Sequence, residues 1–200
     1  MSSIKSLPSD PILLFHKWFE AAKRAKSIVD ATALCVSTVG PGDLPEARMV
    51  LLKDFDERGF VFYTNLHSPK GRQLEKHPYA ALTFHWDALQ KQVRIQGKTE
   101  IVDDSEADAY WRTRARLSQL GAWASKQSEE LSSRTILIKD VAKLALKYGT
   151  SPVPRPPYWT GVRVIPKKIE FWQGQPNRLH DRFLYTSRED ATWELERLAP

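Results

Sequence analysis

Side chains that bind anions gather where a short helix is expected to begin. The run Ser68-Pro69-Lys70-Gly71-Arg72 follows a β-rich segment that ends in Phe62-Tyr63-Thr64-Asn65. Serine followed by proline is typical of a helix N-terminus, where free amide groups and the helix dipole favour negative charge. The run therefore indicates a phosphate site. Lys70 and Arg72 as ordinary solvated charges are the simpler alternative, and these residues alone leave both interpretations open.

A second group of anion-binding side chains has helical spacing. Tyr110, Arg114 and Ser118 follow one another at intervals of four residues. On an unbroken helix they drift by only about 40° per step, so they share one face. Their phenol, guanidinium and hydroxyl groups all donate hydrogen bonds to phosphate oxygens. Without further context, a basic solvated helix is the slightly favoured alternative.

A third segment, Arg48-Met-Val-Leu-Leu-Lys53, has the alternation of a strand. One face carries Arg48, Val50 and Leu52, and the other carries Met49, Leu51 and Lys53, so a cation ends each apolar stripe. A strand with charged ends is an equally good interpretation of these residues alone.

Near the C-terminus, Arg178 and His180 lie two residues apart and close to Trp172. On an extended segment the pair points to the same side. We favour a planar aromatic ligand that stacks on Trp172 while the pair contacts a second ring. A structural turn is the less favoured alternative, because it rarely concentrates these side chains.

Several familiar catalytic patterns are absent from the sequence. It has no glycine-rich dinucleotide loop, no Walker loop, no nucleophile elbow and no histidine pair at metal-ligand spacing. Cys35 is the single cysteine, so an internal disulfide is impossible and a metal site is not expected. If the protein is an enzyme, a bound cofactor is expected to carry the chemistry.

Composition narrows the class of protein. The 200 residues are 42% hydrophobic and 27% charged, with a formal net charge of +6. No apolar run is long enough for a bilayer, and the first residues lack a secretory signal, so we expect a cytoplasmic protein without membrane contact. The positive charge suits an anionic partner. Charge alone leaves nucleic acid and phosphorylated small molecules open, although basic and acidic residues are interspersed.

The pattern of the chain predicts a mainly β protein with flanking helices, of the α+β class. Expected helices cover residues 10–26, 68–77, 105–124 with an interruption near Leu117, and 134–148. Expected strands cover 31–39, 47–54, 59–65, 79–86, 92–102, 158–165, 168–173, 182–186 and 192–198. We expect one domain over residues 1–200, with a flexible segment at 1–9 and a proline-rich connector at 151–157, because strands resume after the helices without a long linker.

Taken together, these motifs resemble the pyridoxamine 5′-phosphate oxidase family. The resemblance runs from about Leu7 to the C-terminus. Its most specific stretches are Arg48-Met-Val-Leu-Leu-Lys53, Val61-Phe-Tyr-Thr-Asn-Leu66, Ser118-Gln-Leu-Gly-Ala-Trp-Ala-Ser-Lys-Gln-Ser128, Ile169-Glu-Phe-Trp-Gln-Gly174, Asn177-Arg-Leu-His-Asp-Arg-Phe-Leu-Tyr185 and Glu196-Arg-Leu-Ala-Pro200. The resemblance implies an FMN-binding split β-barrel that forms a homodimer, with FMN in clefts between the subunits.

The resemblance also implies an activity and a set of site residues. The activity is oxidation of pyridoxamine or pyridoxine 5′-phosphate to pyridoxal 5′-phosphate, with O2 reduced to H2O2. Arg178 and His180 would be catalytic and cover the substrate ring, and Asp30 would lie near the reacting carbon. The substrate phosphate would contact Lys53, Tyr110, Arg114 and Ser118. FMN would contact Arg48, Met49, Val50, Leu51, Lys53, Tyr63, Thr64, Lys70, Gln92, Gln127, Ser128, Trp172 and Arg182.

The sequence departs from the family pattern at two places. Pro69 stands where many members carry an arginine that contacts the FMN phosphate, and Arg72 or a main-chain amide would have to substitute. An Arg- and Tyr-bearing segment that often precedes Leu7 has no counterpart, so weaker closure over the substrate is expected. The alternatives are a flavin or deazaflavin reductase of the same barrel type, a flavin or pyridoxal-phosphate binder with a different or lost activity, and a nucleic-acid-binding module.

Overall fold

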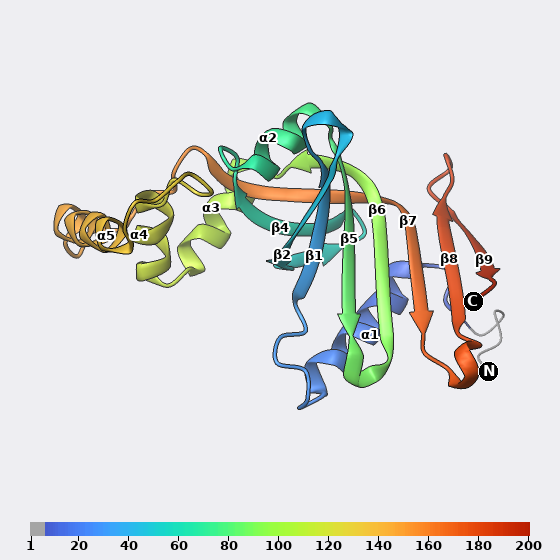
Figure 1. The fold of residues 1–200 in the computed structure, drawn as a ribbon. Helices are drawn as coiled ribbons and strands as arrows, with labels where there is room; N and C mark the ends of the chain where they lie inside the picture. The colour runs from blue at the N-terminus through green and yellow to red at the C-terminus, as the bar shows by residue number, and fades with distance from the viewer. Residues whose placement is uncertain (1–6) are drawn as a thin grey trace.

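One antiparallel sheet forms the body of the protein. The computed structural model describes residues 7–200. Its strands are β1 (Ala33–Val39), β2 (Pro45–Leu51), β3 (Asp54–Asp56), β4 (Gly59–Asn65), β5 (Tyr79–Trp86), β6 (Lys91–Ile101), β7 (Trp159–Gln173), β8 (Asp181–Ser187) and β9 (Trp193–Leu198). They run in the order β2-β1-β5-β6-β7-β4-β3, and β8 pairs with β7 and β9. The sheet curls into a half-barrel (Figure 1), which confirms the predicted mainly β class.

The long strand β7 holds the two parts of the sheet together. It pairs with β6 along most of its length, while its other edge pairs first with β4 and then with β8. The prediction of two strands separated near Pro166 is therefore wrong. Pro166 lies opposite Gly97 at a register shift between Gln96 and Gly97, and a bulge is a place where a sheet accepts proline.

Five α-helices accompany the sheet within the described residues: α1 (Pro11–Arg24), α2 (Pro69–Lys76), α3 (Asp104–Thr113), α4 (Arg116–Ala124) and α5 (Arg134–Tyr148). Helix α1 begins where the Asp10 side chain accepts a hydrogen bond from the main-chain amide of Ile12 at 2.8 Å. Its Phe15 is fully buried and lies edge-on to Phe60 and Phe84 of the sheet, with ring centroids 4.8 and 5.1 Å away. This aromatic contact fixes α1 against the concave core.

Helices α3, α4 and α5 form an arm that projects from the sheet (Figure 1). Residues 151–157 contain no helix or strand and lead from the arm into β7. We keep as a proposal that residues 1–200 form one domain. The predicted flexible segment, residues 1–9, falls mainly on residues 1–6, outside the described part of the chain.

Gly97 provides a test of the bulge. A Cβ atom at this position would lie 1.9 Å from the main-chain oxygen of Ile165, so we expect Gly97→Ala to lower the free energy of unfolding by about 1–3 kcal/mol. Gly121 in α4 is the matched control, because outside its own helical turn no atom of residues 7–200 lies within 4 Å of its added Cβ. Gly121→Ala should leave stability unchanged or raise it by up to about 1 kcal/mol. Urea unfolding measures both, and equal effects would contradict this account.

Candidate active site

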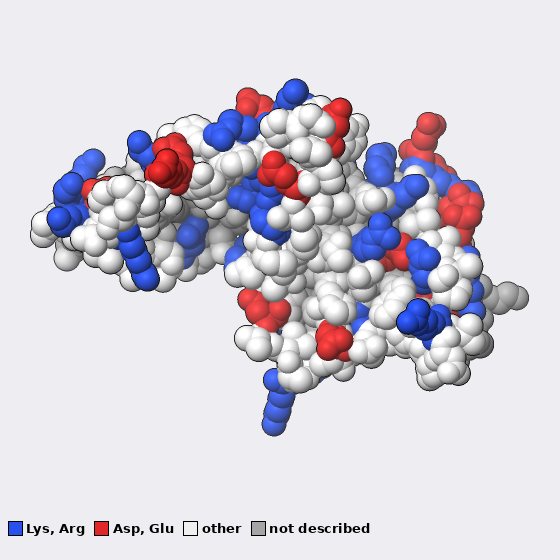
Figure 2. All heavy atoms as spheres, in the orientation of Figure 1, with Lys and Arg blue, Asp and Glu red and all other residues white. Residues whose placement is uncertain are grey.

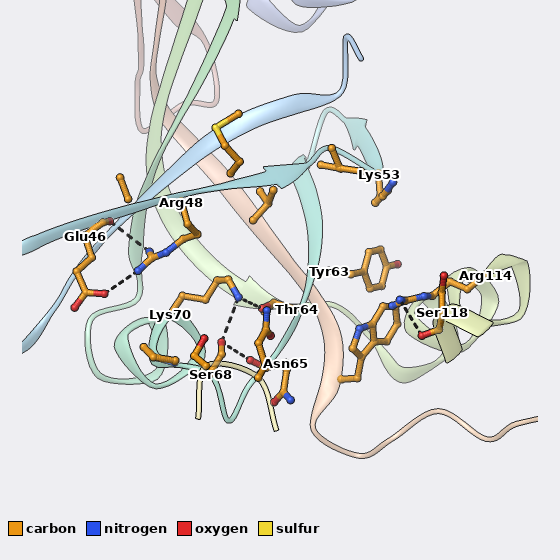
Figure 3. Close-up of a pocket in the computed structure, with 18 of the residues that line it drawn as sticks. Glu46, Arg48, Lys53, Tyr63, Thr64, Asn65, Ser68, Lys70, Arg114 and Ser118 are labelled. Atoms are coloured by element: carbon orange, nitrogen blue, oxygen red, sulfur yellow. Dashed lines mark hydrogen bonds and ion pairs between the residues drawn. The ribbon is translucent and has the colours of Figure 1, made fainter. Parts of the chain in front are cut away.

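A cleft of about 870 Å³ is lined by both the sheet and the helical arm. Figure 2 shows lysine and arginine side chains grouped in the recess between the two parts, and Figure 3 shows the cleft from close by. Strands β2 and β4, the start of α2 and the α3–α4 junction supply most of its walls. The lining residues are Glu46, Ala47, Arg48, Met49, Val50, Leu51, Lys53, Tyr63, Thr64, Asn65, Ser68, Pro69, Lys70, Tyr110, Arg114, Ser118, Gln127, Ser128 and Trp159.

One end of the cleft contains a buried lysine. Lys70 is 7% exposed, and its Nζ donates to the hydroxyl groups of Thr64 at 2.7 Å and Ser68 at 3.3 Å. Burial, and then the charge of Arg48, lower the pKa of Lys70 to about 8. Within residues 7–200, no carboxylate forms an ion pair with this ammonium group. Since an uncompensated buried cation is unfavourable, this end of the cleft is suited to an anionic ligand.

Arg48 lies beside Lys70 at the same end (Figure 3). Its guanidinium group donates to the hydroxyl of Thr38, to the side-chain oxygen of Gln73 and to the carboxylate of Glu46 at 3.0 Å. The partners come from β1, α2 and β2, so they fix the guanidinium group against the wall of the cleft. Together Arg48 and Lys70 place two cations next to the first turn of α2.

The first turn of α2 confirms the expected helix start. The Ser68 hydroxyl accepts a hydrogen bond from the amide of Gly71, and Pro69 occupies the first helical position. A Cβ atom on Gly71 would lie 2.2 Å from the main-chain oxygen of Leu66. Glycine at this position therefore allows the close main-chain approach in the tight connection between β4 and α2. The suggestion that Arg72 substitutes for the missing arginine is not supported. Arg72 is exposed, donates to the main-chain oxygen of His67 and does not line the cleft.

The other end of the cleft contains Arg114, Ser118 and Lys53 (Figure 3). Tyr110, Arg114 and Ser118 do not share one helical face, because the chain is extended at Arg114 and Ala115 and a new helix begins at Arg116. The interruption lies three residues before the predicted one near Leu117. It turns Arg114 and Ser118 toward the same cleft, and the Arg114 guanidinium donates to the Ser118 main-chain oxygen at 3.3 Å.

The helix break adds an anion-binding feature that the sequence pattern did not reveal. No side chain of the described residues caps the N-terminus of α4, so its first amide groups and its dipole favour a negative charge beside Ser118. Burial lowers the pKa of Arg114, although the guanidinium group stays charged at any ordinary pH. No carboxylate among the described residues forms an ion pair with it. This end of the cleft is therefore also suited to an anionic group.

Aromatic rings occupy the space between the two ends. The rings of Tyr63 and Tyr110 stack with centroids 4.1 Å apart, and Tyr63 also stacks on Trp159 at 5.0 Å. Burial raises the pKa of Tyr63 to about 12, so its phenol keeps its proton at neutral pH. Lys53 Nζ lies 6.0 Å from the centre of the Tyr110 ring. Two cationic ends joined by aromatic side chains fit flat ligands that carry phosphate groups.

Most of the predicted site residues meet in this cleft. Those that line it are Arg48, Met49, Val50, Leu51, Lys53, Tyr63, Thr64, Lys70, Tyr110, Arg114, Ser118, Gln127 and Ser128. The cleft also has three wall residues that the sequence did not indicate, Glu46, Ala47 and Trp159. Glu46 lies two residues before Arg48 on the same face of β2, and Trp159 is at the start of β7; neither belongs to a motif that the sequence analysis singled out.

Five predicted residues lie outside this cleft, toward the far end of the sheet. Gln92, Trp172 and Arg182 are direct neighbours across β6, β7 and β8. The ring of His180 lies 4.6 Å from that of Trp172, and its Nδ1 accepts a hydrogen bond from the Gln175 amide at 3.1 Å. Arg178 is exposed on the same loop. We call these five residues the β8 group.

The loop that bears Arg178 and His180 is not the extended segment that their spacing suggested. Residues Pro176–Arg178 form a 3-10 turn, and Asn177 and Arg178 have φ values of 58° and 61°. Asp30 also lies outside the cleft lining, and its carboxylate accepts hydrogen bonds from the amide and hydroxyl of Thr32. The main-chain oxygen of Thr32 in turn accepts a hydrogen bond from the Leu52 amide at 2.8 Å. This contact places the loop that bears Asp30 next to the segment that bears Lys53.

The half-barrel sheet and the cleft with two cationic ends define a split β-barrel protein with a site for anionic ligands. The family model described as "Pyridoxamine 5'-phosphate oxidase" matches residues 21–148, and "Pyridoxine 5'-phosphate oxidase C-terminal dimerisation region" matches residues 159–200. The chain belongs to the pyridoxamine 5′-phosphate oxidase family.

Individual relatives agree with this assignment. The pyridoxine/pyridoxamine 5′-phosphate oxidase of Myxococcus xanthus is 55% identical over 97% of this chain and 93% of its own length. The protein of the same name from Caulobacter vibrioides is 53% identical over 96% of this chain and 85% of its own. Among solved structures, PhzG from Burkholderia lata, in complex with tetrahydrophenazine-1-carboxylic acid, is 31% identical and covers 100% of this chain and 97% of its own, with a TM-score of 0.91.

A more distant structure supports the fold alone. A pyridoxamine 5′-phosphate oxidase-related, FMN-binding protein from Nostoc punctiforme is 20% identical, with a TM-score of 0.73 and full coverage of both chains.

Two further features concern residues 7–200 only. No helix there has the length and apolar character needed to cross a membrane, and no cluster of three or more histidine, cysteine or acidic side chains is arranged to hold a metal ion.

Proposed function

We propose that the protein oxidises pyridoxamine 5′-phosphate or pyridoxine 5′-phosphate to pyridoxal 5′-phosphate, with FMN as cofactor and O2 as electron acceptor. The observation that carries the proposal is the pair of cationic ends in one cleft. FMN and the substrate are both flat ring systems with one phosphate monoester, which bears about −1.5 to −2 charges at neutral pH. The relatives that are 50–55% identical bear the name of this activity.

The Lys70 end of the cleft fits the FMN phosphate. It offers a buried ammonium group without a carboxylate partner, the hydroxyls of Thr64 and Ser68, and the first turn of α2. Among the described strands, β2 ends the sheet and pairs only with β1, so its outer main-chain groups are available to hydrogen-bond a heterocycle. FMN held here would supply the two-electron oxidant for removal of a hydride from C4′ of the substrate, with O2 as the final electron acceptor and H2O2 as its product.

The Arg114 end fits the substrate phosphate. Arg114 contributes a planar fork of donors, Ser118 a hydroxyl at the start of α4, and Lys53 a mobile ammonium group. Fixing the phosphate at this end and the cofactor at the other aligns the reacting carbon, and positioning of this kind contributes up to about 7–11 kcal/mol in ideal cases. The chain's share of catalysis is mainly alignment in a cleft shielded by aromatic rings.

We propose that a second copy of the chain completes the site with the β8 group. These residues do not line the cleft of their own chain, whereas Met49 and Leu51 of the cleft wall are 65% and 40% exposed. Twofold symmetry would bring the β8 group of each subunit to the cleft of the other. The His180 Nδ1 accepts a hydrogen bond, so a neutral ring carries its proton on Nε2, where it can be donated to the substrate.

A direct experiment tests the proposed function. Purified protein should show flavin absorption, and addition of pyridoxamine 5′-phosphate in air should release H2O2 and pyridoxal 5′-phosphate in equal amounts. Pyridoxine 5′-phosphate is assayed in the same way. A yellow protein that turns over neither substrate would instead favour the alternative of a flavin binder with a different or lost activity. A protein that binds no FMN would overturn the proposal.

Removal of the buried ammonium group should weaken FMN binding. We expect Lys70→Met to raise the dissociation constant for FMN by about 10- to 100-fold, because the phosphate loses a charge-assisted hydrogen bond. Lys76→Met is the matched control, since Lys76 is an exposed lysine at the other end of the same helix. Quenching of flavin fluorescence measures both. Equal affinities of the two variants would show that the FMN phosphate binds elsewhere.

The lowered pKa of Lys70 predicts that FMN affinity and the stability of the free protein change in opposite directions with pH. FMN affinity should fall by up to about tenfold between pH 7 and pH 9, as the free protein loses the Lys70 proton near pH 8. The stability of the free protein should change the other way. Between about pH 8 and 10.5 the unfolded chain binds more protons at this residue, so its contribution to stability rises with pH. Both trends should be absent in Lys70→Met.

A further inference from the structure

We propose that Trp159 is a positioning residue for the substrate phosphate and that it acts through Arg114. The inference rests on the proposed function, because it assigns a partner to the arginine that would grip the substrate. Trp159 stands at the start of β7, is 5% exposed and lines the cleft at the Arg114 end.

The guanidinium group of Arg114 lies in a corner formed by two indole rings. Its central carbon is 4.5 Å from the ring centroid of Trp159 and 5.4 Å from that of Trp111. The two indoles are themselves in edge contact, with centroids 4.9 Å apart and an interplanar angle of 64°. A planar guanidinium group is attracted to the face of an indole, most strongly where water is excluded.

Stacking suits an arginine that must bind a ligand. A carboxylate partner would occupy the N–H groups of Arg114, whereas a ring face orients the group and leaves its edge free. The side chain stands at the helix break, and its one hydrogen bond within the described residues is to the Ser118 main-chain oxygen. Trp159 therefore provides the main contact that fixes the direction of the fork.

Trp159 is in turn tied to the helix that leads into Arg114. Its main-chain oxygen accepts from Arg155 at 2.9 Å, and the same guanidinium group donates to Asp104 and Asp108 of α3 at 2.5 Å each. The indole of Trp111 in α3 donates to the Val153 main-chain oxygen at 2.7 Å. The connector of residues 151–157, α3 and Trp159 are thus joined by hydrogen bonds and ion pairs around Arg114.

Two substitutions at Trp159 test this role in the FMN-loaded protein. Trp159→Leu should raise both the dissociation constant for pyridoxal 5′-phosphate and the KM for pyridoxamine 5′-phosphate by about tenfold. Its kcat and its FMN affinity should stay within about threefold of the wild type, since positioning of the phosphate is what is lost. Trp159→Phe keeps a ring face and should recover most of the affinity. A purely structural role would not give this split between KM and kcat, nor this recovery.

Trp123 supplies the matched control. It is also an indole of the helical arm, and its Nε1 donates to the Pro154 main-chain oxygen at 2.7 Å, but it does not line the cleft. Trp123→Leu should leave pyridoxal 5′-phosphate binding unchanged. If Trp159→Leu does not fold, Trp159→Met replaces it as the variant without a ring.

The possible failures are distinguishable. Unchanged pyridoxal 5′-phosphate affinity in the ring-free variant would overturn the inference while leaving the proposed function intact. Equal loss of FMN and pyridoxal 5′-phosphate affinity in both Trp159 variants would also overturn it, because it would indicate general disruption. Wild-type protein that binds pyridoxal 5′-phosphate but releases no H2O2 would refute the proposed function, and the comparison of affinities would still test Trp159.

Discussion

Arg114→Ala is expected to raise the KM for pyridoxamine 5′-phosphate by about 100-fold or more while FMN affinity changes by less than about twofold. Arg114 lies at the opposite end of the cleft from Lys70 (Figure 3), so the two phosphate sites are affected separately. Loss of a bidentate, charge-assisted contact with phosphate accounts for an effect of this size. Steady-state kinetics in air and a flavin titration measure the two quantities.

Two further variants make the Arg114 result specific. Arg116→Ala removes the next arginine, whose guanidinium donates to the main-chain oxygens of Gly149 and Ser151 and does not line the cleft. It should leave KM unchanged. Arg114→Lys keeps the charge but loses the fork and the stacked geometry, so an intermediate KM is expected. An Arg114→Ala protein that purifies without flavin would contradict the assignment of the two ends.

Two inactive variants should restore activity when they share a dimer. His180→Ala alters the β8 group and Arg114→Ala alters the cleft, and each alone should lower kcat/KM severely. In a mixed dimer, one cleft then receives both substitutions and the other receives neither. Random pairing of equal amounts should therefore recover about a quarter of wild-type activity, and purified mixed dimers about half. Co-expression with two different affinity tags supplies the material.

The control for this experiment pairs two substitutions from the same group. Lys53→Ala and Arg114→Ala both alter the cleft, so in their mixed dimer every cleft carries one substitution and no recovery is expected. Recovery in this pair, or none in the pair with His180→Ala, would show that the β8 group does not act in the partner's cleft. Recovery in the Lys53→Ala and Arg114→Ala pair would mean that these two residues do not act in the same cleft. No recovery in the pair with His180→Ala would mean that the β8 group does not complete the partner's site.

Local patterns predicted most of the fold, and long-range pairing explains where they failed. The Ser68-Pro69 start of α2 and the alternating strands were predicted because their signals lie within a few residues. The short β3 was missed, because three residues do not establish a period, and only its first residue, Asp54, fell within a predicted strand. Pro166 indicated a strand end, but its place opposite Gly97 depends on a pairing partner about seventy residues away in the sequence.

The site shows the same division between local and distant information. Tyr110, Arg114 and Ser118 were grouped correctly for a wrong reason, since their meeting depends on the extended residues Arg114 and Ala115 rather than on a continuous helix. Trp159 had no signal, because its role depends on which side chains stack upon it in the folded chain. The resemblance named the β8 group, but no pattern within one chain could say that its residues lie outside their own cleft.

Strand β7 sets a limit on how this architecture can diverge. Its first residue, Trp159, belongs to one cleft wall, and Trp172, near its other end, belongs to the β8 group. Deleting a single amino acid between them would turn every later side chain to the opposite face. Lineages descended from this chain should therefore vary in length at surface loops such as residues 188–191, which are exposed and do not line the cleft, while the distance between these two tryptophans along the polypeptide stays constant.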